Sequence, residues 1–161
     1  MAVSPNVDFV SGAIYTASQA NKFPRGIVGI AQMSSNYTLS TTNTALTTVT
    51  FTAVANRYYK FTYFEPEAQT STVSASTTTV QIRTAATVGG GVELSSGIIT
   101  TSAAVKVQGA ITVSYITDGL GAGSFTINAA ARTSSVTGAP LLVRSATSRA
   151  FLLVEDLGPS V

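Results

Sequence analysis

Residues 48–54 read Thr48-Val49-Thr50-Phe51-Thr52-Ala53-Val54, and this stretch decides the fold class. Apolar and threonine side chains alternate along it, so that one face carries Val49, Phe51 and Ala53 while threonines occupy the other. Successive side chains of a strand point to opposite faces of a sheet. This period of two therefore predicts a half-buried β-strand.

An aromatic segment follows directly after the short connection Ala55-Asn56. Residues 57–64 place Tyr59, Phe61 and Tyr63 on one face. A tight connection between two alternating runs is typical of a β-hairpin. We therefore expect residues 48–54 and 57–64 to pair as neighbouring strands of one sheet.

Strand-like runs recur along the rest of the chain and are separated by polar or glycine-containing turns. They are residues 27–33, 80–83 with the Ser/Thr-rich approach 69–79, 105–115, 123–130 and 150–155. About eight short strands without intervening helices predict an all-β fold, an antiparallel and jelly-roll-like β-sandwich. The Ser/Thr tracts leave open a mucin-like linker or a fibrous shaft as the alternative.

The composition favours one domain with few charges. The chain has 161 residues, of which 10% are charged, against about a quarter in an average protein. Its net charge of +2 comes from scattered basic residues, with no stripe that could neutralise a run of phosphates. We therefore expect no nucleic acid partner. The absence of cysteine excludes a disulfide scaffold and a thiolate zinc site.

The N-terminal part differs from the strand-rich remainder. Residues 1–10 are irregular, and Thr16 with Gln19 has the spacing of a capping box before Pro24 ends any helix. We expect an N-terminal arm with one short helix over residues 1–25, which anchors the protein, and a β-sandwich body over residues 26–161. Neither a signal peptide nor a membrane span is evident, so we expect synthesis in the cytoplasm and no membrane insertion.

Ordinary active-site chemistry has few candidate residues. The chain has no His or Cys, which excludes a Ser-His-Asp triad. Two carboxylate pairs, Glu65 with Glu67 and Glu155 with Asp156, could in principle serve glycoside hydrolysis, but both are interpreted as turn or strand-end residues. Asp118 before Gly119 is a turn signal before it is a calcium ligand. We expect no enzyme activity, no catalytic residue, no cofactor and no metal.

Aromatic side chains offer the best candidates for binding. Alternation places Tyr58 and Phe64 on the outward face with Lys60, where they could line a subunit interface or a ligand surface. An interface is the favoured interpretation. The candidates also include four residues of the arm, Phe9, Phe23, Pro24 and Arg25.

Three phrases of the sequence carry a resemblance to a known class of proteins. They are Pro24-Arg25-Gly26-Ile27-Val28-Gly29, the segment Thr48 to Arg57, and the ending Phe151 to Pro159. The chain resembles the small β-sandwich virion proteins of tailed bacteriophages, of the minor-tail or tail-fibre type. The resemblance implies a structural protein at the virion surface, a homo-oligomer that is often a trimer, and contacts with tail or baseplate proteins. It implies no catalytic residue.

Other functions remain open. The chain is short for a fibre protein, so a capsid decoration (cement) protein that binds the major capsid protein is a close alternative. A carbohydrate- or receptor-binding module that recognises a host surface glycan is a further one, and a glycan array with Tyr58 and Phe64 substitutions would test it. Loss of polysaccharide turnover in Glu65→Gln or Glu155→Gln would reveal an enzyme.

Overall fold

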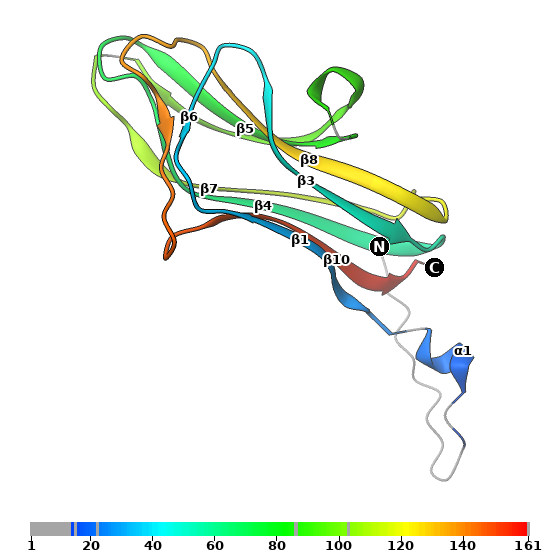
Figure 1. The fold of residues 1–161 in the computed structure, drawn as a ribbon. Coiled ribbons are helices and arrows are strands. Elements are labelled where there is room, and N and C mark those ends of the chain that lie inside the picture. The colour runs from blue at the N-terminus through cyan, green and yellow to red at the C-terminus, as the bar shows by residue number, and fades with distance from the viewer. Residues whose placement is uncertain (1–13, 15, 22, 86, 103, 161) are drawn as a thin grey trace.

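A computed structural model describes residues 14, 16–21, 23–85, 87–102 and 104–160. It consists almost entirely of antiparallel strands arranged in two sheets that face each other (Figure 1). The first sheet contains, in spatial order, β1 (Gly26–Met33), β10 (Ala150–Pro159), β4 (Arg57–Gln69) and β7 (Gln108–Thr117). The second contains β3 (Thr44–Ala53), β8 (Gly123–Thr133), β5 (Ser76–Thr84) and β6 (Glu93–Thr101).

This strand order is that of a jelly roll. Each sheet interleaves strands from the beginning and the end of the chain, with β10 between β1 and β4 and β8 between β3 and β5. Two short pieces, β2 (Tyr37–Thr38) and β9 (Leu141–Leu142), extend the first sheet. The expected all-β sandwich with eight main strands is thus confirmed.

The core lies between the two sheets, where the alternation of each strand directs its apolar side chains. Tyr59, Phe61 and Tyr63 of β4 are buried there, as predicted. They face Phe51 of β3, whose ring centroid lies 5.3 Å from that of Tyr59 and 5.9 Å from that of Phe61. Such tilted and edge-on contacts between rings add to the free energy of burial.

The predicted hairpin of residues 48–54 and 57–64 is wrong, because β3 and β4 belong to opposite sheets. β3 pairs with β8, while β4 pairs with β10 and β7. Asn56 has a positive φ of 58°, and the Val54 amide donates to the Tyr59 hydroxyl at 2.8 Å instead of to a neighbouring strand. The connection is an arch across the sandwich, which lets Phe51 and Phe61 pack edge to face between the sheets.

The short helix is found where it was expected, whereas one predicted strand begins later than expected. The short helix α1 (Ala17–Ala20) is present, and Thr16 and Gln19 form the predicted capping box. It lies outside the sandwich, beyond the end at which β10 finishes (Figure 1). The strand expected over residues 105–115 begins only at Gln108, because the Val107 carbonyl and amide both bond to Thr70 in a loop contact and Val105 is exposed.

A 3-10 turn, η1 (Val88–Gly90), lies in the connection between β5 and β6, which pair antiparallel.

Candidate functional site

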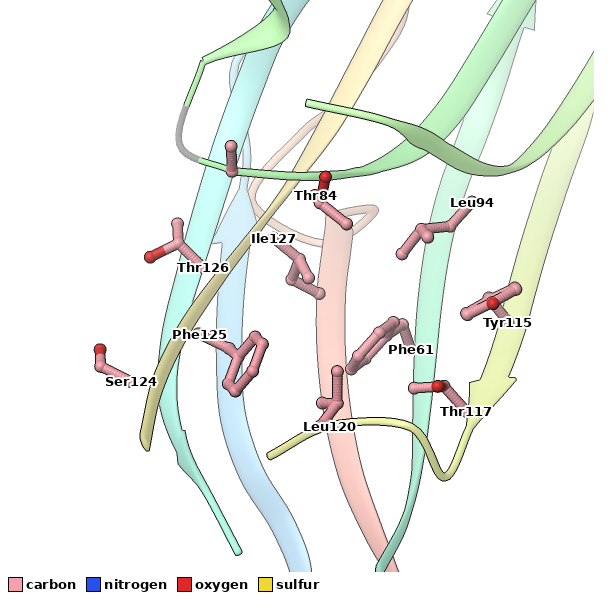
Figure 2. Close-up of a pocket in the computed structure, with 11 residues that line it drawn as sticks. Phe61, Thr84, Leu94, Tyr115, Thr117, Leu120, Ser124, Phe125, Thr126 and Ile127 are labelled. Atoms are coloured by element: carbon pink, nitrogen blue, oxygen red, sulfur yellow. The ribbon is translucent and has the colours of Figure 1, made fainter. Parts of the chain in front are cut away.

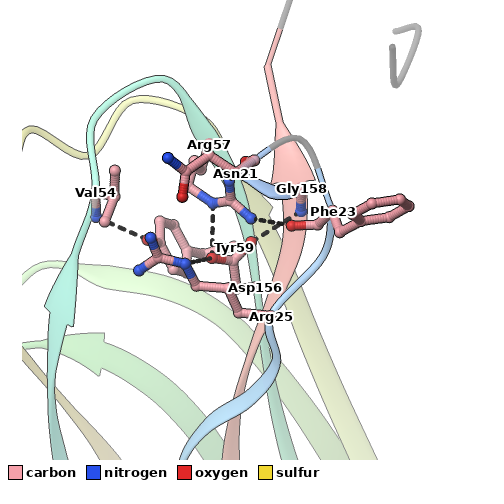
Figure 3. A network of polar contacts seen from close by, with 8 residues as sticks. All are labelled: Asn21, Phe23, Arg25, Val54, Arg57, Tyr59, Asp156 and Gly158. Carbon is pink, nitrogen blue, oxygen red and sulfur yellow. Dashed lines mark hydrogen bonds and ion pairs between the residues drawn. The ribbon is translucent and has the colours of Figure 1, made fainter. Parts of the chain in front are cut away.

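The root of the N-terminal arm is bound to the end of the sandwich by one buried arginine. Arg57 is the first residue of β4, and its side chain is only 4% exposed. Its guanidinium donates from Nη1 to the carbonyl of Asn21 and from Nη2 to the carbonyl of Phe23, both at 2.6 Å (Figure 3). Two fixed donors thus hold two backbone acceptors of the arm, a use for which the planar fork of arginine is suited. We call residues 21 and 23–25 the arm root.

Asp156 on β10 provides the countercharge for Arg57. Its Oδ2 accepts from Arg57 Nε at 2.7 Å, and its Oδ1 accepts from the Gly158 amide at 2.9 Å (Figure 3). Arg25 of the arm root adds a second cation, with Nε 3.9 Å from Oδ2. A buried carboxylate needs such partners, because an unpaired charge in the interior is costly. Oδ2 of Asp156 therefore neutralises the arginines at the arm root, while Oδ1 holds the β10 backbone at Gly158.

A bulge in β10 brings Asp156 to this position. The pairing of β10 with β4 shifts register between Asp156 and Gly158, which has a φ of +110°. A side chain at residue 158 would meet the ring of Pro24 at 3.7 Å, so the arm root lies directly against this glycine. The interpretation of Asp156 as a strand-end residue is wrong, because β10 continues past it to Pro159, and its side chain is buried.

The structure places the six predicted binding residues in different environments. Phe23, Pro24 and Arg25 come together in the arm root, where Phe23 is 39% exposed. Phe9 lies outside the described residues. Phe64 is half-buried on the outward face of β4, and its ring stacks on that of Phe151 at 5.4 Å.

Tyr58 is only 6% exposed, so its predicted outward, accessible position is wrong. It does not belong to the core between the sheets, and its neighbour in the register is Gly158 of β10. The pKa of Tyr58 is raised, first by desolvation and then by the nearby Asp118 carboxylate. Tyr58 therefore lies close to Asp118, the first residue after β7.

A second buried charge pair joins Glu65 of β4 to Arg144, which follows β9. Glu65 has no exposed surface, and its carboxylate accepts from Arg144 Nε at 3.0 Å, from Arg144 Nη2 at 2.6 Å and from the Tyr63 hydroxyl at 2.5 Å. Burial and the Glu65 carboxylate raise the pKa of Tyr63 well above its ordinary value. Burial acts to lower the pKa of Arg144, but its interactions with Glu65 and Tyr63 together outweigh burial and raise it.

Glu65 was interpreted as an exposed turn residue before Pro66, and that interpretation is wrong. β4 continues through Pro66 to Gln69, and its pairing with β7 shifts register between Glu65 and Ala68. Proline is tolerated at such a bulge, where the ladder needs no amide donor. A carboxylate held in the core by two partners supports the sandwich and presents no surface to a substrate.

An apolar pocket of about 340 Å³ opens between the two sheets (Figure 2). Phe61 and Ile127 form its buried part, while Leu94, Tyr115 and Phe125 form half-buried walls. Leu120, from the loop between β7 and β8, points toward Phe61 and Phe125 (Figure 2). The remaining lining residues are Thr84, Ala85, Thr117, Ser124 and Thr126.

Sequence reasoning missed Arg57, Asp156, Arg144 and this pocket. The position of Arg57 at the start of an aromatic strand was the one sequence feature that could have indicated a buried ion pair, because a charge that becomes buried needs a partner. Its partner is 99 residues away in the sequence, and no local pattern connects the two. The pocket arises only when the walls of both sheets come together.

Among the described residues, no group of three or more acidic side chains could hold a metal ion. Across the same residues, no helix has the length and apolar character needed to cross a membrane.

No protein-family model and no curated protein matches the chain. Among solved structures, it is similar to an arabinose-bound α-L-arabinofuranosidase, MgGH51, with 14% identity, a TM-score of 0.32, and 88% of this chain and 24% of that chain covered. It is also similar to the infectious bursal disease virus Gx strain, with 10% identity, a TM-score of 0.24, and 86% and 42% covered. The chain thus spans less than half of each protein, and likenesses of this degree carry no argument about its function.

Proposed function

We propose that this chain is a non-enzymatic structural component of a tailed-phage virion, a minor-tail or fibre-type surface protein. Its N-terminal arm docks on a neighbouring virion protein, and its jelly roll is exposed. The observation that carries this proposal is the buried contact of Arg57 with the carbonyls of Asn21 and Phe23.

A clamp of this kind has a mechanical consequence. Because the arm root is fixed to β4 and β10, a protein that binds the arm next to it restricts the place and orientation of the jelly roll. A flexible tether would leave the body free to rotate. Rigid mounting is what an assembly subunit needs, and jelly rolls are common in viral capsid proteins. The three sequence segments that resemble virion proteins of tailed bacteriophages are the reason for proposing a phage particle.

The outward face of the first sheet supports self-association, and we propose a homotrimer. Ile27 and Ile30 of β1 are 61% and 51% exposed. Phe151 and Leu153 of β10 and Phe64 of β4 continue this apolar face at partial exposure, because each alternates with core residues. Contiguous apolar surface on a small protein indicates an interaction site.

The capsid decoration role is the second candidate for the same arm-and-body design, with the major capsid protein as the partner. Imaging of labelled particles distinguishes a position on the tail from a position on the head. Native mass measurement of the purified chain gives the oligomer, and gold-labelled antibody on purified particles gives the place. Label on tails supports the minor-tail role, and label distributed over heads supports the decoration role. Absence of the chain from intact particles would refute both.

The glycan-binding alternative loses one of its two aromatic candidates, because Tyr58 is covered. Phe64 remains, half-buried beside Phe151. A glycan array probed with the wild-type chain and with Phe64→Ala tests what is left of this proposal. Glycan binding that Phe64→Ala removes would support a receptor-binding role in addition to the structural one.

A further inference from the structure

The apolar pocket between the sheets is not used by the arm or by the charge pairs. It lies where β4 and β7 of one sheet face β6 and β8 of the other, with Leu120 of the β7–β8 loop across from Phe61 and Phe125 (Figure 2). Its volume of about 340 Å³ falls within the range of about 300 to 1,000 Å³ typical of small-molecule sites. The pocket therefore has the size of a binding site instead of a packing defect.

We infer that this pocket binds a neutral, flat, apolar molecule of one or two fused rings that carries one hydrogen-bond acceptor. None of the eleven lining residues is charged. A charged ligand would lose its hydration without gaining a countercharge there, whereas a neutral one matches the lining. The inference concerns the isolated chain and does not depend on the proposed virion role.

The aromatic walls favour a flat ring. Phe61 and Tyr115 are stacked with centroids 6.3 Å apart and an interplanar angle of 22°. Phe125 is packed at 6.3 Å against Phe51, which in turn contacts Phe61 at 5.9 Å. These contacts hold the walls in place before any ligand arrives, so little freedom is lost on binding. Offset stacking and edge contacts with such walls favour aromatic ligands.

One hydroxyl of the lining favours an acceptor on the ligand. Thr117 Oγ1 accepts from the Gly119 amide at 3.2 Å. A hydroxyl that accepts in this way keeps its own hydrogen to donate. A ligand with a hydroxyl, ether or carbonyl oxygen therefore fits better than a pure hydrocarbon.

The test is a titration of the full chain with 2-naphthol, followed by its thermal midpoint and by amide chemical shifts. We expect saturable binding, a rise in the midpoint, and shifts centred on Leu120, Phe125 and Ile127. The matched anion 2-naphthoate should bind at least tenfold more weakly, because its charge has no partner in the pocket. Equal affinity for the two compounds, or no saturable binding, would overturn the inference.

A pair of variants locates the site. Leu120→Trp should fill the pocket and weaken 2-naphthol binding at least tenfold, while Val136→Trp adds the same side chain to an exposed loop position outside the lining and should leave the affinity within twofold. Unchanged binding by Leu120→Trp would contradict the assignment. If that variant fails to fold, the shift map of the wild-type chain decides, and shifts remote from the pocket would overturn the inference.

One competing occupant is the arm of another copy, whose residues 1–13 include Val7, Phe9 and Val10. A synthetic peptide of residues 1–13, added to the full chain with bound 2-naphthol, distinguishes the two. No displacement is expected. Displacement at stoichiometric peptide would show that the pocket is a docking site for the arm and would overturn the small-molecule assignment.

Discussion

Arg57 at the start of β4 and Asp156 in the bulge of β10 form a buried ion pair, with Nε 2.7 Å from Oδ2. The same guanidinium binds the carbonyls of Asn21 and Phe23, so one side chain joins two strands and the arm root. The pair thereby links the stability of the sandwich to the position of the arm.

Replacing Arg57 by Ala should lower the free energy of unfolding by about 3–5 kcal/mol, because Asp156 would remain buried without its main partner. Denaturant unfolding followed by circular dichroism measures this. Lys60→Ala is the matched control on the same strand, since Lys60 pairs at 3.7 Å with Glu155 and the two side chains are 38% and 30% exposed. That pair should contribute about 1 kcal/mol or less. Equal losses in the two variants would mean that Arg57 contributes only ordinary packing.

The Glu65 and Arg144 pair makes a distinct prediction about coupling. Glu65→Leu alone and Arg144→Met alone should each cost about 3–5 kcal/mol, because each leaves a buried charge. The double variant should cost much less than the sum of the two single variants, since no charge then remains unpaired. A double-mutant cycle by chemical denaturation measures the coupling. Additive losses would show that the two side chains act independently.

Alkaline pH should destabilise the fold through Tyr63. Its pKa is raised in the folded state, whereas tyrosine in the unfolded chain titrates near about 10. Its contribution to stability is therefore fully present below pH of about 10 and is lost as the pH rises toward the folded pKa. The stability difference between wild type and Tyr63→Phe should stay constant from about pH 7 to 9 and shrink above about pH 10. A difference that does not change through that range would contradict the raised pKa.

Gly29 of β1 should not tolerate a side chain. A Cβ at this position would lie 2.5 Å from Cγ1 of Val49 in the facing sheet, and overpacking of a core typically costs about 1–3 kcal/mol. Gly121→Ala is the control, because nothing lies within 4 Å of a Cβ there. Its effect should stay within about 0.5 kcal/mol. Thermal melts of the two variants test this, and a Gly29→Ala protein as stable as wild type would show that the sheets separate easily.

The fold class was predictable because it depends on local periodicity. Alternation of apolar and polar residues gave the strands, and the Thr16 to Gln19 spacing gave the short helix. Local periodicity does not predict which strands pair with each other. The arch at residues 54–56 has the length of a hairpin loop, and only the packing of Phe51 against Tyr59 and Phe61 across the sandwich identifies it.

The candidate site was only partly predictable, for a related reason. Phe23, Pro24 and Arg25 were identified from their place before the first strand, and they do meet in the arm root. The sequence predicts a turn residue at Glu65 and a strand end at Asp156, because each stands near a proline or glycine that usually ends a strand. Both strands instead continue through bulges and carry their carboxylates inward to arginine partners.

The docking role of the arm is the central claim, and particle incorporation tests it most directly. Particles assembled with the full chain and with a chain lacking residues 1–13 should be purified and their content of this protein measured by quantitative mass spectrometry. The deletion leaves the contacts of Arg57 with Asn21 and Phe23 in place. We predict that the full chain is incorporated at a fixed copy number and that the shortened chain, folded by circular dichroism, is absent from particles. Equal incorporation of the two chains would contradict the claim.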